Sequence, residues 1–266
     1  CGSASVSDMV VTGGDVAVFA ANCPGLSVSD CDLSRSFIGI WVHNSLGCEV
    51  TGNEVDGALD IGIWVGGGSN GSLIADNTLT GCSNYSIRAE MCSTTVSGNS
   101  VLGGGWGIAV GFYVGPVSVT NNTVSGSGTG IHATHMYQET AVVEGNEVVG
   151  CRWGVRVTLS EGAEVSENRL TENTYGVMME ACSNCTVRDN SITDGDYGIY
   201  LLDCGGVEVV DNSIDRVDVE AFDNNDGENS WDTEGFPIGM VAVAVAVSLL
   251  VVVLLATFLY RHRKAA

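Results

Sequence analysis

Residues 143–148 of this 266-residue chain read V-E-G-N-E-V, and residues 153–157 read W-G-V-R-V. The asparagine of the first motif recurs every 22 to 24 residues, with an apolar residue three positions before it and another two positions after it. The recurring asparagines are Asn53, Asn77, Asn99, Asn122, Asn146, Asn168, Asn190 and Asn212. A fixed period of this length indicates a repeat architecture, in which each unit buries its apolar face by stacking on its neighbours.

The second motif places a glycine about eight residues after the asparagine, followed by apolar residues at alternating positions. Examples are G-I-W-V at 62–65, G-I-A-V at 107–110 and G-I-Y-L at 198–201. Both motifs have a period of two, which is typical of strands, whereas helical repeats need apolar residues spaced by three and four. The unit is therefore predicted to be one turn of a parallel β-solenoid, and the same frame gives about ten turns of 22–24 residues between residue 1 and about residue 215.

Equivalent residues of successive turns should lie about 4.8 Å apart, so that like side chains form ladders. The asparagines are expected to form one internal ladder at a buried bend, because an amide both donates and accepts hydrogen bonds. The glycine is expected to permit the sharp entry into the second strand.

The pattern V-x-x-N-x-V, followed by an aromatic residue and Gly-Ile-x-Val, resembles the right-handed parallel β-helix repeat superfamily. Trp106-Gly107-Ile108 and Tyr197-Gly198-Ile199 carry this likeness well. The superfamily includes pectate lyases, microbial surface proteins and maturation proteins of nitrous-oxide reductase, so the resemblance implies an all-β, right-handed parallel β-helix but no single activity. It also implies that the aromatic residues before the glycine form a structural stack, and these are Tyr85, Trp106, Trp153, Tyr175 and Tyr197.

The last fifty residues predict how the rod is held. Residues 216–236 are rich in Asp, Glu, Asn and Gly and are interpreted as an acidic flexible stalk between the ectodomain, 1–215, and a membrane anchor. Residues 238–260 contain no charge and are long enough for a transmembrane α-helix within 237–260. The basic tail 261–266 follows, so the positive-inside rule predicts a single-pass plasma-membrane protein with the rod outside and the tail in the cytoplasm. Because Cys1 falls in the middle of a repeat, further turns and a secretion signal are expected upstream.

The charge balance narrows the partners. The chain has 32 acidic and 10 basic residues, a net charge of −22. Such a field excludes nucleic acid as a partner. It suits a solvated exterior and could attract divalent cations, but no turn contains a recognisable calcium loop, so no cofactor is predicted and calcium is left open.

Ten cysteines in an exported chain suggest disulfides. Cys1 and Cys23 occupy equivalent positions of neighbouring turns, and so do Cys182 and Cys204. Each pair is compatible with a disulfide, although stacked thiols in the core fit equally well.

Chemistry should lie on the outward positions of the second strand, because the inward ones fill the core. These positions vary more than any others and include aromatic, basic and carboxylate side chains, which suit the recognition of a sugar chain. The candidate ligand-binding residues are Trp41, Trp64, Arg88, Glu90, His132, Arg156, Glu180 and Tyr200. An ordinary solvated sheet face, with Arg156 and Glu180 as a surface ion pair, is the alternative.

The sequence therefore favours a cell-surface β-helix that acts as a binding or structural module for glycans or other surface proteins. A polysaccharide lyase or hydrolase is a second hypothesis, although no catalytic residues are identified and the Asn-Thr-Asp and Gly-His-Gly motifs of the superfamily's hydrolases are missing. Extracytoplasmic copper handling is a third, suggested by the resemblance and by His132, His135, Met136, Met178 and Met179. The spacing of the two histidines does not require them to converge.

Overall fold

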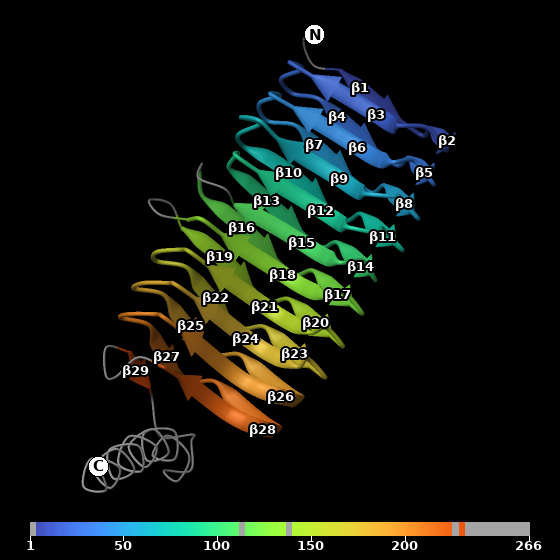
Figure 1. The fold of residues 1–266 in the computed structure, drawn as a ribbon. Coiled ribbons are helices and arrows are strands. Elements are labelled where there is room, and N and C mark those ends of the chain that lie inside the picture. Colours follow the sequence, from blue (N-terminus) through green and yellow to red (C-terminus); the bar gives the residue numbers. More distant parts are fainter. Residues whose placement is uncertain (1–3, 112–114, 137–139, 225–228, 232–266) are drawn as a thin grey trace, which may run out of the picture.

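In the computed structural model the chain is a parallel β-solenoid (Figure 1). The structure describes residues 4–111, 115–136, 140–224 and 229–231. Each turn contributes one strand to each of three faces, and every strand pairs in parallel with its equivalent in the next turn. The asparagine motif thus forms two short strands that meet at the asparagine, and the glycine motif forms the third, longer strand. The prediction of a ten-turn, all-β parallel solenoid is confirmed.

The first face is one sheet of eleven strands. Its strands are β1 (Ser5–Ser7), β4 (Ser27–Ser29), β7 (Glu49–Thr51), β10 (Ser72–Ala75), β13 (Thr94–Ser97), β16 (Val117–Thr120), β19 (Ala141–Glu144), β22 (Glu164–Ser166), β25 (Thr186–Arg188), β27 (Glu208–Val210) and β29 (Ser230–Trp231).

The second face holds the short strands that follow the asparagine corner. They are β2 (Val10–Thr12), β5 (Asp32–Ser34), β8 (Glu54–Asp56), β11 (Thr78–Thr80), β14 (Ser100–Leu102), β17 (Thr123–Ser125), β20 (Glu147–Val149) and β23 (Arg169–Thr171).

The third face holds the longer strands. They are β3 (Val16–Ala21), β6 (Ile38–His43), β9 (Ile61–Gly66), β12 (Tyr85–Glu90), β15 (Trp106–Gly111), β18 (Thr129–Thr134), β21 (Trp153–Thr158) and β24 (Tyr175–Glu180). In the last two turns β26 (Ser191–Leu202) and β28 (Ser213–Asp223) run without a break across the second and third faces.

The core of the rod is a set of aliphatic ladders. Val50, Ile74 and Val96 on the first face lie in register and are fully buried, and Ile40, Ile63 and Ile87 do the same on the third face. From β4 to β27 each short strand adds one or two buried apolar residues, and each third-face strand from β3 to β24 adds at least two, such as Ile40 and Val42 in β6. These residues depend on neighbouring turns for their burial, which is why a single turn could not fold alone.

The asparagines form the predicted internal ladder. Asn146 Nδ2 donates to Asn168 Oδ1 at 2.9 Å and to Val119 O at 2.9 Å, while its Oδ1 accepts from the backbone N of Asn122 at 2.9 Å. The pattern repeats from Asn53 to Asn190, all of them nearly inaccessible, and ends at the partly buried Asn212. Each amide thus satisfies backbone groups that the corner would otherwise leave unpaired.

The glycine at the second position of the third-face strand, Gly130 in β18, is needed because the turns approach closely. A Cβ on Gly130 would lie 2.6 Å from Gly154 O and 2.4 Å from Val148 Cγ1. The restriction is therefore steric crowding against the next turn rather than the strained backbone entry that the sequence suggested. Ser86 holds the same place in its own turn and is fully buried.

The boundary predicted at residue 215 is wrong, because the coil continues into the segment interpreted as a stalk. Val217, Val219 and Ala221 in β28 pair with β26, and Ser230 and Trp231 in β29 pair with β27. The acidic composition of 216–236 hid this last turn, since Asp218 and Glu220 alternate with its apolar residues and it has no asparagine or glycine motif of its own.

The membrane anchor lies outside the described residues. In the part of the chain that the structure describes, no helix is long and apolar enough to cross a bilayer. The predicted transmembrane helix over 238–260 and the tail 261–266 fall beyond Trp231 and stay predictions.

Candidate functional site

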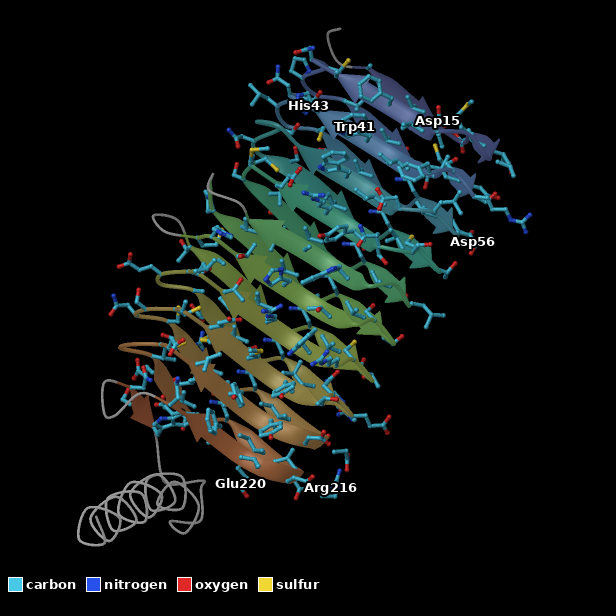
Figure 2. The ribbon with its side chains drawn as sticks, in the orientation of Figure 1. Asp15, Trp41, His43, Asp56, Arg216 and Glu220 are labelled. Carbon is cyan, nitrogen blue, oxygen red and sulfur yellow. The ribbon has the colours of Figure 1, made fainter. Side chains whose placement is uncertain are left out.

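One outward residue of each third-face strand forms a continuous stripe along the rod. Strand pairing places its members in register from turn to turn. The stripe consists of Phe19, Trp41, Trp64, Arg88, Ala109, His132, Arg156, Met178, Tyr200 and Phe222. Figure 2 shows side chains along the whole face, with Trp41 near the N-terminal end and Glu220 near the C-terminal end.

At the N-terminal end of the stripe the aromatic rings cover one another. Trp41 and Trp64 stack with ring centroids 4.8 Å apart and planes 4° apart, and Phe19 lies 5.0 Å from Trp41 on the other side. The Arg88 guanidinium lies 5.2 Å from the Trp64 ring. Protein groups therefore occupy both faces of each indole, so a sugar would meet ring edges here instead of the open faces that the sequence suggested.

Arg88 and Glu90 form an ion pair beside this stack. Arg88 Nη2 lies 2.5 Å from Glu90 Oε2, and Trp64 Nε1 donates to Glu90 Oε1 at 3.0 Å. The guanidinium also lies 5.1 Å from the Tyr85 ring. The arginine is thus held between two aromatic rings, and the nearly buried carboxylate fixes its direction.

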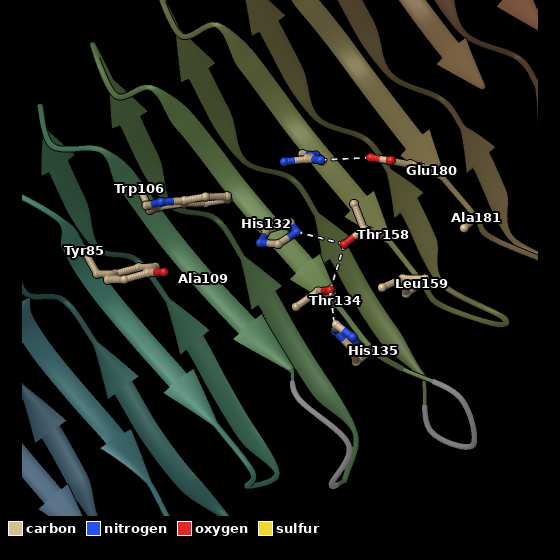
Figure 3. Close-up of a pocket in the computed structure, with 11 residues that line it drawn as sticks. Tyr85, Trp106, Ala109, His132, Thr134, His135, Thr158, Leu159, Glu180 and Ala181 are labelled. Atoms are coloured by element: carbon tan, nitrogen blue, oxygen red, sulfur yellow. Dashed lines mark hydrogen bonds and ion pairs between the residues drawn. The ribbon is translucent and has the colours of Figure 1, made fainter. Parts of the chain in front are cut away.

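A cleft of about 400 Å³ opens on the stripe over β15, β18, β21 and β24 (Figure 3). It begins where the stripe carries the small Ala109 between the larger Arg88 and His132. Its lining consists of Tyr85, Trp106, Ala109, His132, Thr134, His135, Arg156, Thr158, Leu159, Glu180 and Ala181. Three predicted ligand-binding residues, His132, Arg156 and Glu180, are brought together there, and Trp41, Trp64, Arg88, Glu90 and Tyr200 are not.

The aromatic wall of the cleft comes from residues that the sequence assigned to a structural stack. Tyr85 and Trp106 do stack, with centroids 5.9 Å apart, and Trp106 lies 4.9 Å from the His132 ring at a tilt of 38°. Thr129 separates Trp106 from Trp153 in the register, so the predicted stack is divided into two parts at the cleft. The interruption was visible in the sequence as a threonine at an aromatic position.

Two histidines meet through two threonine hydroxyls on the floor of the cleft. His132 Nε2 lies 3.0 Å from Thr158 Oγ1, Thr158 Oγ1 lies 2.7 Å from Thr134 Oγ1, and Thr134 Oγ1 lies 2.8 Å from His135 Nδ1 (Figure 3). The sequence did not require this convergence, because strand and turn residues need not face each other. Here His135 adopts a positive φ of 58°, which turns the chain at the end of β18.

The environment of His132 keeps its imidazole neutral. Burial, then the nearby charge of Arg156 and that of His135, together lower the pKa of His132 to about 4. A neutral imidazole and two hydroxyls can each donate and accept hydrogen bonds, which is the chemistry that matches sugar hydroxyl groups.

The far wall carries the ion pair foreseen from the sequence. Arg156 Nη2 donates to Glu180 Oε2 at 2.9 Å, and the guanidinium lies 5.1 Å from the Trp153 ring. The Arg156 Nε atom is buried and has no hydrogen-bond partner in the described structure. Both arginines of the stripe, Arg88 and Arg156, are therefore neutralised by a neighbouring carboxylate.

Tyr200 belongs to a separate aromatic cluster near the C-terminal end of the stripe. It stacks on Phe222 at 4.4 Å and meets the edge-on rings of Tyr197 and Tyr175 at 5.5 and 5.3 Å. Tyr175 and Tyr197 themselves stack at 4.8 Å. This packing accounts for Tyr200 without a ligand.

The nine cysteines that the structure describes are buried in the interior. Cys23 is disulfide-bonded, and Cys1, its predicted partner, lies outside the described residues. Cys182 and Cys204 are thiols, and hydrogen bonding with Cys185 and Cys204, together with burial, raises the pKa of Cys182. Cys182 and Cys204 are therefore stacked thiols in the core, which was the alternative to a disulfide that the sequence left open.

The described residues contain no group of three or more His, Cys, Asp or Glu side chains placed to hold a metal ion. Of the residues considered for copper, Met136 and Met179 are buried in the core, whereas Met178 lies on the stripe.

Two family models match the chain and overlap in its middle. The model described as right handed beta helix region matches residues 1–148, and the model described as periplasmic copper-binding protein (NosD) matches residues 107–241. No curated protein sequence matches this chain.

Several solved structures share the fold. The periplasmic alginate epimerase AlgG superposes with a TM-score of 0.56 at 16% identity, covering 74% of this chain and 51% of that one. The catalytic domain of a GH87 alpha-1,3-glucanase in complex with nigerose gives 0.56 at 12% identity, covering 79% and 50%. The A-module of the Azotobacter vinelandii mannuronan C-5 epimerase AlgE6 gives 0.53 at 14% identity, covering 78% and 82%. This chain therefore spans about half the length of the first two, and identities this low show the fold alone.

Proposed function

Because this chain belongs to the right-handed β-helix family, whose model matches residues 1–148, we propose that it displays a glycan-binding cleft on a rigid rod at the cell surface. The observation that carries the proposal is the cleft itself. One strand face places an aromatic wall of Tyr85 and Trp106 opposite the polar wall of Arg156 and Glu180, with imidazole and hydroxyl groups between them.

These groups suit a sugar ring better than an apolar ligand. A sugar presents an apolar face of C–H groups and a rim of hydroxyls, which need an aromatic surface and paired donors and acceptors. The solved structures with this fold include proteins named for acting on alginate or alpha-1,3-glucan, which supports polysaccharides as the ligand class. The predicted anchor at 238–260 would hold the cleft outside the bilayer, with the membrane as a second partner.

The test is a glycan array followed by isothermal titration of the full chain with the best array ligand. Trp106→Ala removes part of the aromatic wall, and Ala109→Trp fills the gap with the side chain that the stripe carries at Trp64. Each should lower the affinity by about tenfold or more. Trp41→Ala, on the same stripe but outside the cleft, is the matched control and should bind normally.

Lost binding in Trp41→Ala, with normal binding in the two cleft variants, would place binding on the N-terminal stack instead. No binding by the unmodified chain would reject the proposal. The neutral His132 imidazole and the Glu180 carboxylate line the same cleft, which also favours polysaccharide turnover as a second candidate. New products from an incubated polysaccharide, absent with His132→Gln, would identify the protein as an enzyme.

A further inference from the structure

The charges in and around the cleft compensate one another. Besides its two histidines, the lining contains one cation, Arg156, and one anion, Glu180, joined at 2.9 Å. The neighbouring residues Arg88 and Glu90 also form an ion pair, so their charges compensate each other in the same way. No uncompensated cation therefore faces the cleft from the described residues that line it.

The rest of the molecule adds a strongly negative field. With a net charge of −22, the chain repels polyanions at low ionic strength, and only a local cation in the site could reverse that preference. Among the described residues that line the cleft, only Arg156 carries a permanent positive charge, and Glu180 already neutralises it.

The hydrogen-bonding groups fit hydroxyls rather than carboxylates. His132, Thr158, Thr134 and His135 are linked in one chain in which each hydroxyl can both donate and accept. A ligand hydroxyl can join such a chain in either direction, whereas a carboxylate only accepts and would place its charge within reach of Glu180.

We propose that the cleft is selective for neutral glycans and discriminates against uronates and other anionic sugars through the closed Arg156–Glu180 pair. This inference rests on the proposed function, and it deepens that function by naming the class of ligand. Alginate, which the name of AlgG mentions, is a polyuronate and is therefore not the ligand that we expect for this cleft.

Matched sugar pairs test the inference directly. Oligouronates of about six units are compared with their carboxyl-reduced counterparts, which have the same linkage and no charge, by titration into the full chain at low salt and at high salt. The neutral member should bind at least about fivefold tighter at low salt, and the difference should narrow at high salt as the negative field is screened.

Glu180→Gln exposes the charge of Arg156 and is expected to raise the affinity for the oligouronate by at least about fivefold. Glu147→Gln is the matched control. It makes the same change in net charge on an exposed carboxylate whose ion pair with Arg169, at 3.7 Å, lies on the second face. That variant should keep the preference for the neutral sugar.

Tighter binding of the oligouronate by the unmodified chain would overturn the inference and leave glycan binding intact. Identical behaviour of Glu180→Gln and Glu147→Gln would overturn the role of the ion pair. Failure of every sugar to bind the unmodified chain would remove the proposed function and this inference with it.

Discussion

His132 shows how a single residue takes its character from the neighbouring turns. Its ring lies against Trp106 of the preceding turn and its Nε2 faces Thr158 of the following one. Burial and the adjacent Arg156 charge then hold the pKa of His132 at about 4, well below its ordinary 6.5. An imidazole that would be a pH sensor on an open surface is here a neutral hydrogen-bonding group at physiological pH.

Replacing His132 should flatten the dependence of stability on pH. Between pH 6.5 and 4 the unfolded chain protonates this histidine and the folded chain does not, so the folded state loses stability as the pH falls through that range. The loss attributable to His132 is about 2 kcal/mol, allowing for its partial exposure.

Urea unfolding of the unmodified chain and of His132→Gln at pH 7 and pH 4 measures the difference. His43→Gln, on an exposed histidine of the same face but outside the cleft, is the control for the His-to-Gln change itself. A His132→Gln variant that loses as much stability on acidification as the unmodified chain would contradict the prediction.

At the scale of the element, the asparagine corner fixes the register of every turn. Each amide bonds to the next asparagine, to a carbonyl of the preceding turn and to a carbonyl of its own turn, as Asn146 does with Asn168, Val119 and Glu144. A slip of one residue would break all of these bonds at once. This accounts for an asparagine at the same place in eight consecutive turns.

Asn146→Leu should lower the free energy of unfolding by about 1 to 3 kcal/mol, because it leaves buried polar groups of the adjacent turns unpaired. Chemical denaturation followed by far-ultraviolet circular dichroism measures the change. Ser125→Leu controls for a new leucine, since it lies beside the exposed Leu102 in register. Comparable losses in both variants would show that the ladder contributes little.

The same elements show what a single sequence can predict. The turn, its corners and the inward ladders follow from the repeat, because stacking makes neighbouring turns chemically alike. The cleft arises where neighbours differ, at Ala109 and Thr129, and its shape depends on which way the rings of Trp106 and His132 lean. Likewise, the outward position of Trp41 and Trp64 could be predicted, but the mutual covering of their faces could not, since it depends on side-chain rotamers.

At the scale of the whole molecule, the rod carries the cleft, and the predicted anchor is expected to hold the rod at the membrane. Deleting residues 237–266 should move the protein from the membrane fraction to the soluble fraction, because the uncharged stretch 238–260 supplies the apolar length that a bilayer requires. Fractionation with a high-salt wash measures the shift. Deleting only 261–266 keeps the uncharged stretch and should leave the protein in the membrane fraction. If the protein without residues 237–266 also stays in the membrane fraction, another part of the chain anchors it.

The direction of the hydrogen bonds between turns has a mechanical consequence. Strands of successive turns pair along the length of the rod, so a pull on its two ends loads one layer of bonds at a time, like opening a zipper. Each layer that opens releases a segment of 22 to 24 residues, which extends to about 75 Å at 3.3 to 3.6 Å per residue, against the 4.8 Å that it occupied. Under tension the rod therefore lengthens in steps, one turn at a time. The outermost turns open first, so the chain extends many-fold before the force reaches the turns that carry the cleft.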